Sequence, residues 1–177
     1  MFGGLQERSL RVNITYEEMA FEKRAEQSPQ DIAAINHLLA QLSSRAPEVD
    51  LHTIVRVLHD GAIVIARDGD SGGRLVGMGT ILFAHKLTAA FASIEDVVVD
   101  ERYRGCGIGA SITARLIEKA KERQVAYVDL TSSPRRVAAN ALYRKLGFVA
   151  RETNPFRLEL TIKPDAAKQE TPRAASG

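Results

Sequence analysis

Apolar residues follow two different periods along this chain, and each period predicts a different kind of element. After Ser28-Pro29-Gln30-Asp31, a sequence that favours the start of a helix, apolar residues recur at helical spacing. They are Ile32, Ile35, Leu38, Leu39 and Leu42. Pro47 marks a break, and Asp50 is placed to cap a further helix over Leu51 to Leu58. The pattern therefore predicts a pair of helices early in the chain.

Shorter apolar runs separated by turn residues predict the strands. Ala20 to Ala25 can supply a first strand. Ala62 to Ala66 predict another, which the turn Asp68 to Gly73 joins in a hairpin to Leu75 to Phe83. A further strand begins at Phe91. With the elements described next, the expected order is β-α-α-β-β-β-α-β-α-β, which is a mixed α/β chain (α+β with a mixed sheet).

The stretch IEDVVVDERYRGCGIGA, Ile94 to Ala110, joins a strand, a charged turn and a glycine loop. The β-branched run Val97 to Val99 favours a strand that is buried on both faces. Alternating glycines leave backbone N–H groups uncovered just before a helix that begins at Ile108, so a diphosphate can bind at the positive end of that helix. Arg104 adds a cation. The helix should bury one stripe and expose another, formed respectively by Ile112, Leu116 and Ala120 and by Arg115, Lys119 and Arg123.

A dinucleotide-binding fingerprint is the nearest alternative for this loop. Gly105, Gly107 and Ala110 fit G-x-G-x-x-A, and Asp129 lies at a suitable distance downstream. In that fingerprint, however, the first glycine follows its strand almost at once, whereas the polar stretch Asp100 to Arg104 intervenes here. Asp129 also lies inside an apolar run, and too little chain follows the loop for a doubly wound sheet. These features disfavour a dinucleotide site.

A second informative segment, VDLTSSPRRVAANALYRKLGF, runs from Val128 to Phe148. Val128 to Thr131 predict a strand. Ser133 and Pro134 favour the N-cap and first turn of a short helix over Val137 to Leu146, which Gly147 closes.

Together the two segments resemble the GCN5-related N-acetyltransferase (GNAT) family. Arg104-x-x-Gly107-x-Gly109 is similar to the family's acetyl-CoA loop, and ALYRKLGF, Ala141 to Phe148, is similar to its last helix. The resemblance is strong from Ile94 to about Val149 and holds only in outline over the first ninety residues. It implies the acyl-CoA N-acyltransferase fold, a mostly antiparallel central sheet flanked by helices. It also implies transfer of an acetyl group from acetyl-CoA to an amine by direct attack, without a covalent acyl-enzyme.

The resemblance further implies which residues contact acetyl-CoA, the co-substrate. The strand before the loop presents its main chain to the acetyl and pantetheine groups, and the loop backbone binds the pyrophosphate. The family often has Asn at the position of Arg136, but helical spacing places Arg136, Asn140 and Tyr143 on one face, so Arg136 or Asn140 can replace that contact. The implied cofactor residues are Val97, Val98, Val99, Arg104, Gly105, Cys106, Gly107, Ile108, Gly109, Ala110, Arg136, Asn140 and Tyr143.

The resemblance also implies two catalytic roles. Tyr143 occupies the position of a tyrosine that protonates the departing CoA thiolate, although a phenol of pKa ~10 needs local help to protonate a thiolate of pKa ~8.5. The alternative for Tyr143 is a core aromatic residue with a satisfied hydroxyl. Glu95 matches a carboxylate that takes a proton from the attacking amine. Asp96, on the opposite face of a regular strand, and water are the other candidates for the base.

Composition narrows the class of protein. A chain of 177 residues, 45% of them hydrophobic, can bury one core. We expect a flexible leader over residues 1–10, an acetyltransferase domain over 11–162 and a disordered tail over 163–177. A net charge of +2 gives no argument for nucleic acid as a partner. The single cysteine, Cys106, excludes an internal disulfide, and we expect it to be no nucleophile.

The sequence also gives expectations for metal binding, cellular location and oligomeric state. No pattern of metal ligands is present, so we expect no metal. No apolar run reaches the ~20 residues that cross a membrane, and no signal-peptide core is seen, so we expect a cytoplasmic protein without a membrane partner. Many members of the resembled family are homodimers, which we expect here too.

The sequence says least about the identity of the acceptor amine. A cationic acceptor such as a polyamine needs gathered carboxylates, but Glu48, Asp50 and Asp60 are thinly spread. IEDVVVD is similar to amino-sugar acetyltransferases, although that strand serves the cofactor. His85-Lys86 can line the acceptor pocket. A small amine, an amino acid and a protein amine stay open, as does the alternative of a non-catalytic acetyl-CoA sensor or interaction module.

Overall fold

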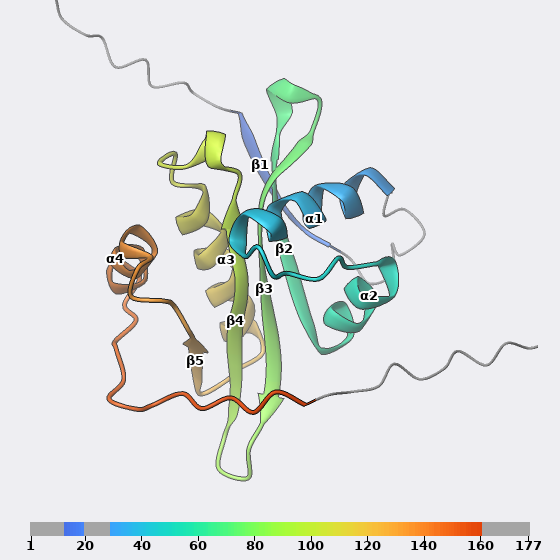
Figure 1. Cartoon of the computed structure of the whole chain (residues 1–177). Helices are drawn as coiled ribbons and strands as arrows, with labels where there is room; N and C mark the ends of the chain where they lie inside the picture. Colours follow the sequence, from blue (N-terminus) through green and yellow to red (C-terminus); the bar gives the residue numbers. More distant parts are fainter. Residues whose placement is uncertain (1–12, 20–28, 161–177) are drawn as a thin grey trace, which may run out of the picture.

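The computed structural model describes residues 13–19 and 29–160, and a five-stranded sheet lies at its centre (Figure 1). The strands follow chain order across the sheet, with antiparallel pairing from the first to the fourth and parallel pairing between the last two. They are β1 (Ile14–Glu18), β2 (Gly61–Asp68), β3 (Arg74–His85), β4 (Ala90–Val99) and β5 (Tyr127–Leu130). The predicted mixed, mostly antiparallel sheet is thereby confirmed.

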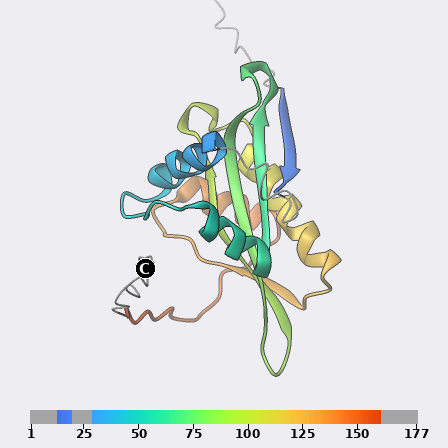
Figure 2. The same cartoon turned by 90° about the vertical axis from the view of Figure 1, so that its right-hand side faces the viewer.

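Helices cover both faces of this sheet (Figures 1 and 2). Helices α1 (Pro29–Leu42) and α2 (Leu51–Asp60) pack on one face, α3 (Ile108–Glu122) packs on the other, and α4 (Val137–Lys145) lies beside β5. Two short 3₁₀ turns, η2 (Gly69–Ser71) and η3 (Glu101–Tyr103), follow β2 and β4.

Most of the helix and turn predictions are confirmed. Helix α1 begins at the predicted Pro29, and the Asp50 carboxylate caps α2 by accepting from the Thr53 backbone N–H at 2.8 Å. The hairpin between β2 and β3 turns through Gly72 and Gly73, which both have positive φ.

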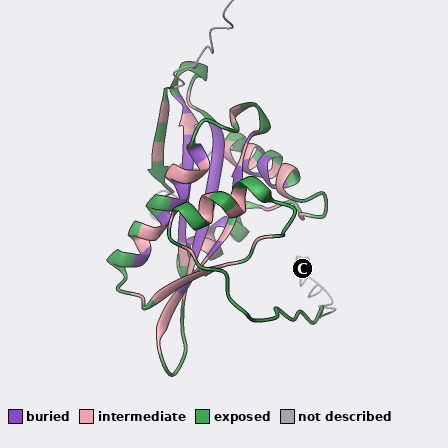
Figure 3. Ribbon diagram, turned by 90° about the vertical axis from the view of Figure 1, so that its left-hand side faces the viewer, coloured by how far each residue is buried: buried purple, intermediate pink, exposed green. Residues whose placement is uncertain are grey.

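The sheet separates two apolar clusters, and its central strands are the most buried part of the fold (Figure 3). One cluster lies under α1 and α2 and includes Val98, and the other lies under α3, where Val97 and Val99 pack against it. The predicted burial of this valine run on both faces is therefore confirmed, with Val97 and Val99 only partly buried.

Close packing of α3 depends on Gly79 in β3. A Cβ atom at that position would lie 2.8 Å from Ile112 Cγ2 and 3.0 Å from Leu116 Cδ1, both on the predicted buried stripe of the helix. The predicted basic stripe lies at the surface and also holds α3 to the sheet, because Lys119 Nζ lies 2.8 Å from Glu18 of β1 and the Arg115 guanidinium lies 4.6 Å from the Tyr16 ring centre.

Two predictions were wrong. The N-cap position of α4 is Arg136, which makes no side-chain capping bond, instead of Ser133, because residues 133–136 form a separate turn closed by a hydrogen bond from the Arg136 N–H to the Ser133 carbonyl at 3.0 Å. The final strand expected after this helix is absent from residues 149–160, where no pairing to the sheet is formed and Pro155 cannot donate to a ladder.

Three further expectations fall outside the described residues. They are the strand over Ala20 to Ala25, the leader over residues 1–10 and the tail over 163–177. The first strand that the structure describes is β1.

Candidate cofactor and acceptor site

The site begins where β4 and β5 stop pairing. The parallel ladder joins Phe91–Ile94 to Tyr127–Leu130, but β4 continues to Val99 after β5 has ended. In the described residues, no strand pairs with the end of β4 on this side. Its main-chain donors and acceptors on that edge are available to a ligand.

A β-bulge interrupts β4 at the same place. The register with β3 pairs Met78 with Val98 but Thr80 with Glu95, so that one residue of β4 is extra. Asp96 has a φ of 50°, and the buried Thr80 hydroxyl donates to the Glu95 carbonyl at 3.1 Å. The regular strand on which the opposite placement of Glu95 and Asp96 was predicted is therefore not formed.

The two candidate bases have different surroundings. Glu95 accepts a hydrogen bond from the Ser93 hydroxyl at 2.6 Å. Desolvation by the surrounding atoms, and secondly the negative charge of Glu95, raise the pKa of Asp96. Its carboxyl group therefore binds a proton more tightly than an ordinary aspartate.

A cavity of about 500 Å³, the cofactor cleft, opens beside the end of β4. Its walls come from the end of α1, the end of β4, the cation before the glycine loop and the start of α4. They are Gln41, Leu42, Val97, Val98, Val99, Arg104, Arg135, Arg136, Val137, Ala138, Ala139 and Tyr143. The structure thus brings together the predicted valines, Arg104, Arg136 and Tyr143, which come from separate parts of the sequence.

The glycine loop adjoins this cleft through Arg104, whose Nε donates to the Val99 carbonyl at 3.3 Å. Gly105 and Gly107 have φ values of 81° and 78°, in the left-handed region, and Gly107 is the N-cap of α3. Open backbone N–H groups at a helix start favour an anion. The other predicted loop residues, Cys106, Ile108, Gly109 and Ala110, belong to this turn and the first turn of α3, and the Ile108 side chain is buried in the core.

A buried carboxylate fixes the entry to the loop. Asp100 is 1% exposed and accepts hydrogen bonds from Arg102 Nη2 at 2.8 Å and from its Nε at 3.1 Å. Hydrogen bonding to Arg102 is the main cause that lowers the pKa of Asp100 to about 2. Sequence reasoning missed this residue, although an aspartate placed between a valine run and an arginine-rich turn was the available signal.

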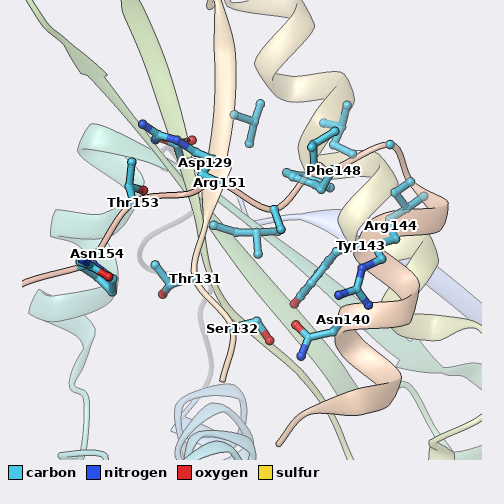
Figure 4. Close-up of a pocket in the computed structure, with 18 residues that line it drawn as sticks. Asp129, Thr131, Ser132, Asn140, Tyr143, Arg144, Phe148, Arg151, Thr153 and Asn154 are labelled. Atoms are coloured by element: carbon cyan, nitrogen blue, oxygen red, sulfur yellow. Dashed lines mark hydrogen bonds and ion pairs between the residues drawn. The ribbon is translucent and has the colours of Figure 1, made fainter. Parts of the chain in front are cut away.

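Tyr143 lies in the wall between the cofactor cleft and a second cavity, of about 690 Å³. This second cavity, the β5 cavity, is bounded by β5, α4 and residues 147–155 (Figure 4). The Tyr143 ring lies edge-on to the Phe148 ring, with the two ring centroids 5.9 Å apart. Burial raises the pKa of Tyr143, against the opposing effect of the Arg136 charge, so the phenol is protonated at neutral pH.

The β5 cavity also holds polar groups. Ser132 Oγ is buried there with no hydrogen-bond partner. Asn140 lines this cavity instead of the cofactor cleft, and its amide donates to the Ser133 carbonyl at 3.0 Å. Asn140 therefore lines the β5 cavity together with Tyr143 (Figure 4), whereas the predicted valines, Arg104 and Arg136 line the cofactor cleft.

Three residues that were predicted for the acceptor pocket or for catalysis lie outside both cavities. Lys86 binds the Tyr127 hydroxyl at 2.8 Å at the β3–β4 turn, and neither it nor His85 lines either cavity. Glu95 also lies outside both linings. The cleft also contains Arg135, a residue not predicted from the sequence, although the Arg135-Arg136 pair before the helix was the available signal.

The sheet opens between parallel strands, next to a glycine loop at a helix start and to three arginines, and this arrangement in an α/β protein is suited to a phosphorylated ligand. The sequence model of the family described as Acetyltransferase (GNAT) family matches residues 24–148. The chain belongs to this family, which confirms the resemblance and the acetyltransferase class.

Relatives agree with this assignment. Glucosamine 6-phosphate N-acetyltransferase of Trypanosoma brucei brucei is 38% identical over 91 residues, which are 50% of this chain and 59% of that protein. Glucosamine 6-phosphate N-acetyltransferase 1 of Oryza sativa subsp. japonica is 30% identical over 134 residues, 68% of this chain and 79% of the relative. The crystal structure of a Trypanosoma brucei acetyltransferase superposes with a TM-score of 0.66 at 28% identity, covering 84% of this chain and 100% of that one.

Two other kinds of feature are absent from the described part of the chain, a membrane-spanning helix and a cluster of metal ligands. No helix in residues 13–19 and 29–160 is long and apolar enough to cross a membrane. The same residues contain no group of His, Cys, Asp or Glu side chains that could hold a metal ion.

Proposed function

We propose that this protein transfers the acetyl group of acetyl-CoA to a primary amine by direct attack. The observation that carries the proposal is the position of Tyr143, a protonated phenol in the wall that the cofactor cleft shares with the β5 cavity. A proton donor so placed can reach a thiolate on the cleft side while an acceptor approaches from the other side.

The residues of the cleft fit acetyl-CoA, which supplies the acetyl group when bound. The unpaired edge of β4 at Val97 to Val99 suits an amide-containing pantetheine arm. The loop from Arg104 to Gly109 offers backbone N–H groups to the pyrophosphate, and Arg135 and Arg136 add positive charge to the wall.

A base must take the proton that the attacking amine loses. We assign this role to Glu95, directly or through water, as the family resemblance implies. Asp96 is the competing carboxylate, because a raised pKa makes it the stronger base and because it stands at the bulge beside the open edge of β4. Comparison of Glu95→Gln with Asp96→Asn separates the two. Substitution of the residue that acts as base should lower kcat by ~100-fold or more, and substitution of the other carboxylate should not.

The acceptor proposed for the first test is the amine of an amino-sugar phosphate. This rests on the names of the relatives from T. brucei brucei and rice, both called glucosamine 6-phosphate N-acetyltransferases. The similarity of IEDVVVD to amino-sugar acetyltransferases supports the same choice.

The experiment combines thiol release with calorimetry. Free CoA is measured from acetyl-CoA with glucosamine 6-phosphate, glucosamine, amino acids, polyamines and lysine peptides, and acetyl-CoA alone is titrated by calorimetry. We expect turnover with the amino-sugar phosphate. Cofactor binding without turnover on any amine would favour a non-catalytic acetyl-CoA sensor, and absence of binding would refute the site.

Tyr143→Phe tests the acid role in the same assays. We expect a ~100-fold or greater loss of kcat with little change in acetyl-CoA affinity, because only the proton is removed. Phe148→Leu is the matched control, since it alters the ring contact with Tyr143 but leaves the hydroxyl in place. Equal loss of kcat and affinity in Tyr143→Phe would contradict the acid role.

A further inference from the structure

A hydrogen-bonded pair of side chains on α1 reaches the turn that leads to the glycine loop. His37 and Gln41 lie one helical turn apart, and the Nε2 atoms of the two side chains are 2.9 Å apart. On its other side, the Gln41 amide meets the start of η3, where its Oε1 accepts from the Glu101 backbone N–H at 2.9 Å. Gln41 also lines the cofactor cleft. This side chain thus connects α1, the cleft and the entry to the glycine loop.

The direction of both hydrogen bonds follows from the chemistry of the partners. A backbone N–H can only donate, so the atom that Gln41 turns towards Glu101 must be its carbonyl oxygen. The amide NH₂ group then faces His37, and because this group can only donate, His37 Nε2 must accept. An imidazole nitrogen accepts only when it carries no proton. The arrangement therefore requires a neutral His37 with its proton on Nδ1.

Protonation of His37 is incompatible with this arrangement. Both nitrogens of an imidazolium donate, so Nε2–H would face the Gln41 NH₂ group, donor against donor. If the amide turned over, its oxygen would accept from His37, but its NH₂ group would then face the Glu101 N–H, which is again donor against donor. In either orientation the protonated form loses one of the two hydrogen bonds.

A neighbouring carboxylate offers the protonated form another partner. Asp100 Oδ2 lies 3.9 Å from His37 Nε2. Hydrogen bonding to Arg102 lowers the pKa of Asp100 to about 2, so this carboxylate stays charged where histidines titrate. Arg74 of β3 and Arg102 of η3 contact the same carboxylate, and Glu101 follows it in the chain. A cationic His37 is therefore drawn towards Asp100 and away from the amide.

We propose that His37 is a positioning residue for the cofactor loop: its neutral form orients the Gln41 amide, which holds the start of the loop, and its protonation releases that hold and weakens acetyl-CoA binding. A loop that is held before the cofactor arrives loses less conformational freedom on binding. The effect passes through Gln41, because a cation near the cleft would by itself strengthen the binding of an anionic cofactor. The inference rests on the proposed function, since it concerns acetyl-CoA in the cofactor cleft.

Calorimetric titration with acetyl-CoA between about pH 5.5 and about pH 8.5 tests the proposal. Other groups of the protein and the cofactor titrate in this range, so each profile is compared with that of His37→Gln. The glutamine oxygen can accept from Gln41 at every pH and binds no proton. Relative to His37→Gln, we expect the unmodified chain to bind equally well at the upper pH and at least about threefold more weakly at the lower pH, as for the loss of a modest hydrogen bond.

Three further variants separate this role from a merely structural one. His37→Lys, which can only donate, should bind at least about threefold more weakly than His37→Gln even at the upper pH. In a Gln41→Leu background, His37→Gln should no longer change the pH profile. Tyr103→Phe is the matched control, because it removes another bond that holds the same turn, from the Tyr103 hydroxyl to Asp68 at 2.8 Å, and should act equally at both pH values.

Two binding results would overturn the inference. One is a profile of the unmodified chain that coincides with that of His37→Gln. The other is an affinity that rises, relative to His37→Gln, as the pH falls, which would show direct attraction of the cofactor by the His37 charge. Absence of binding at every pH would refute the proposed function, and this inference with it.

The protonated nitrogen of His37 gives a readout that needs no cofactor. Nitrogen NMR of the histidine-labelled full chain, with His37→Gln to assign the signals, shows which ring nitrogen carries the proton at about pH 8. We expect the proton on Nδ1 and a bare Nε2. A proton on Nε2 would overturn the inference even if acetyl-CoA binds, so its failure is distinguishable from failure of the proposed function.

Discussion

Replacing Asp100 by asparagine should destabilise the protein through the loop that leads to the cofactor site. The carboxylate is 1% exposed and contacts Arg102 at 2.8 Å and Arg74 at 3.5 Å. It also caps η3, where its oxygen accepts from the Arg102 backbone N–H at 3.1 Å. An amide keeps the shape of the side chain but removes the charge.

The expected size of the effect follows from the pKa shift. The pKa of Asp100 falls from 3.8 to about 2 in the folded protein, and one pKa unit corresponds to about 1.4 kcal/mol. The carboxylate itself is shielded, but Arg102 and Arg74 are 55% and 43% exposed, so solvent screens part of the attraction. We therefore expect Asp100→Asn to lower the free energy of unfolding by about 1 to 2 kcal/mol at neutral pH.

The sign of the pH dependence is fixed by the same shift. A folded-state pKa below the unfolded value stabilises the protein above pH 3.8, and this contribution is lost as the pH falls through the window from 3.8 to about 2. The difference between the unmodified chain and Asp100→Asn should therefore be constant near neutral pH and should shrink in that acidic window.

Urea unfolding followed by circular dichroism at several pH values measures this difference. Glu118→Gln is the control, because Glu118 is 63% exposed and forms only a surface pair with Lys121, for which we expect less than about 0.5 kcal/mol. Equal stability of Asp100→Asn and the unmodified chain at neutral pH would refute the reasoning. A deficit that stays the same down to pH 2 would show that the carboxylate charge is not its cause.

Three further predictions test the sheet and the cofactor cleft. Gly61→Ala should lower the free energy of unfolding by roughly 1–3 kcal/mol in urea, because the added Cβ would lie 1.9 Å from the Ile81 carbonyl oxygen; full stability would contradict the close approach. Gly107→Glu should weaken acetyl-CoA binding in calorimetry at least tenfold, since it strains a φ of 78° and repels the diphosphate; unchanged affinity would exclude the loop. Arg135→Gln should weaken the same binding by about tenfold, whereas Arg144→Gln, outside the cleft, should not, and equal effects would argue against Arg135.

The strand, loop and helix between Ile94 and Ala120 were predictable from sequence because local physics determines them. A valine run forms a strand, glycines with positive φ form the loop, and apolar spacing forms α3, all within Ile94 to Ala120. None of these features needs a distant contact to be recognised. The same holds for Asp50, whose capping contact lies only three residues away.

Two unpredicted features, the bulge in β4 and the wall that α1 gives the cofactor cleft, depend on partners far apart in sequence. The bulge that places Asp96 at a φ of 50° arises from its register with Thr80 in β3. Arg136 donates to the Leu42 carbonyl at 3.0 Å, a contact between residues 94 positions apart that brings the end of α1 into the cleft. The pattern of a single strand or helix contains no information about such pairs.

The two cavities that meet at Tyr143 differ in the elements that form their walls. The cofactor cleft is bounded by α1, β4 and α4, which are tied together by the contact between Arg136 and Leu42 and by a bond from the Glu101 N–H to Gln41 Oε1 at 2.9 Å. The β5 cavity is bounded instead by an unpaired strand edge and by a chain segment held there through Arg151 and Asp129. A cleft whose walls are tied together suits an unchanging ligand such as acetyl-CoA, whereas in the β5 cavity, the proposed acceptor side, the segment of residues 147–155 sets much of the shape. Acceptor choice in this protein is therefore expected to depend on residues 149–155, most of which line the β5 cavity, more than on the glycine loop.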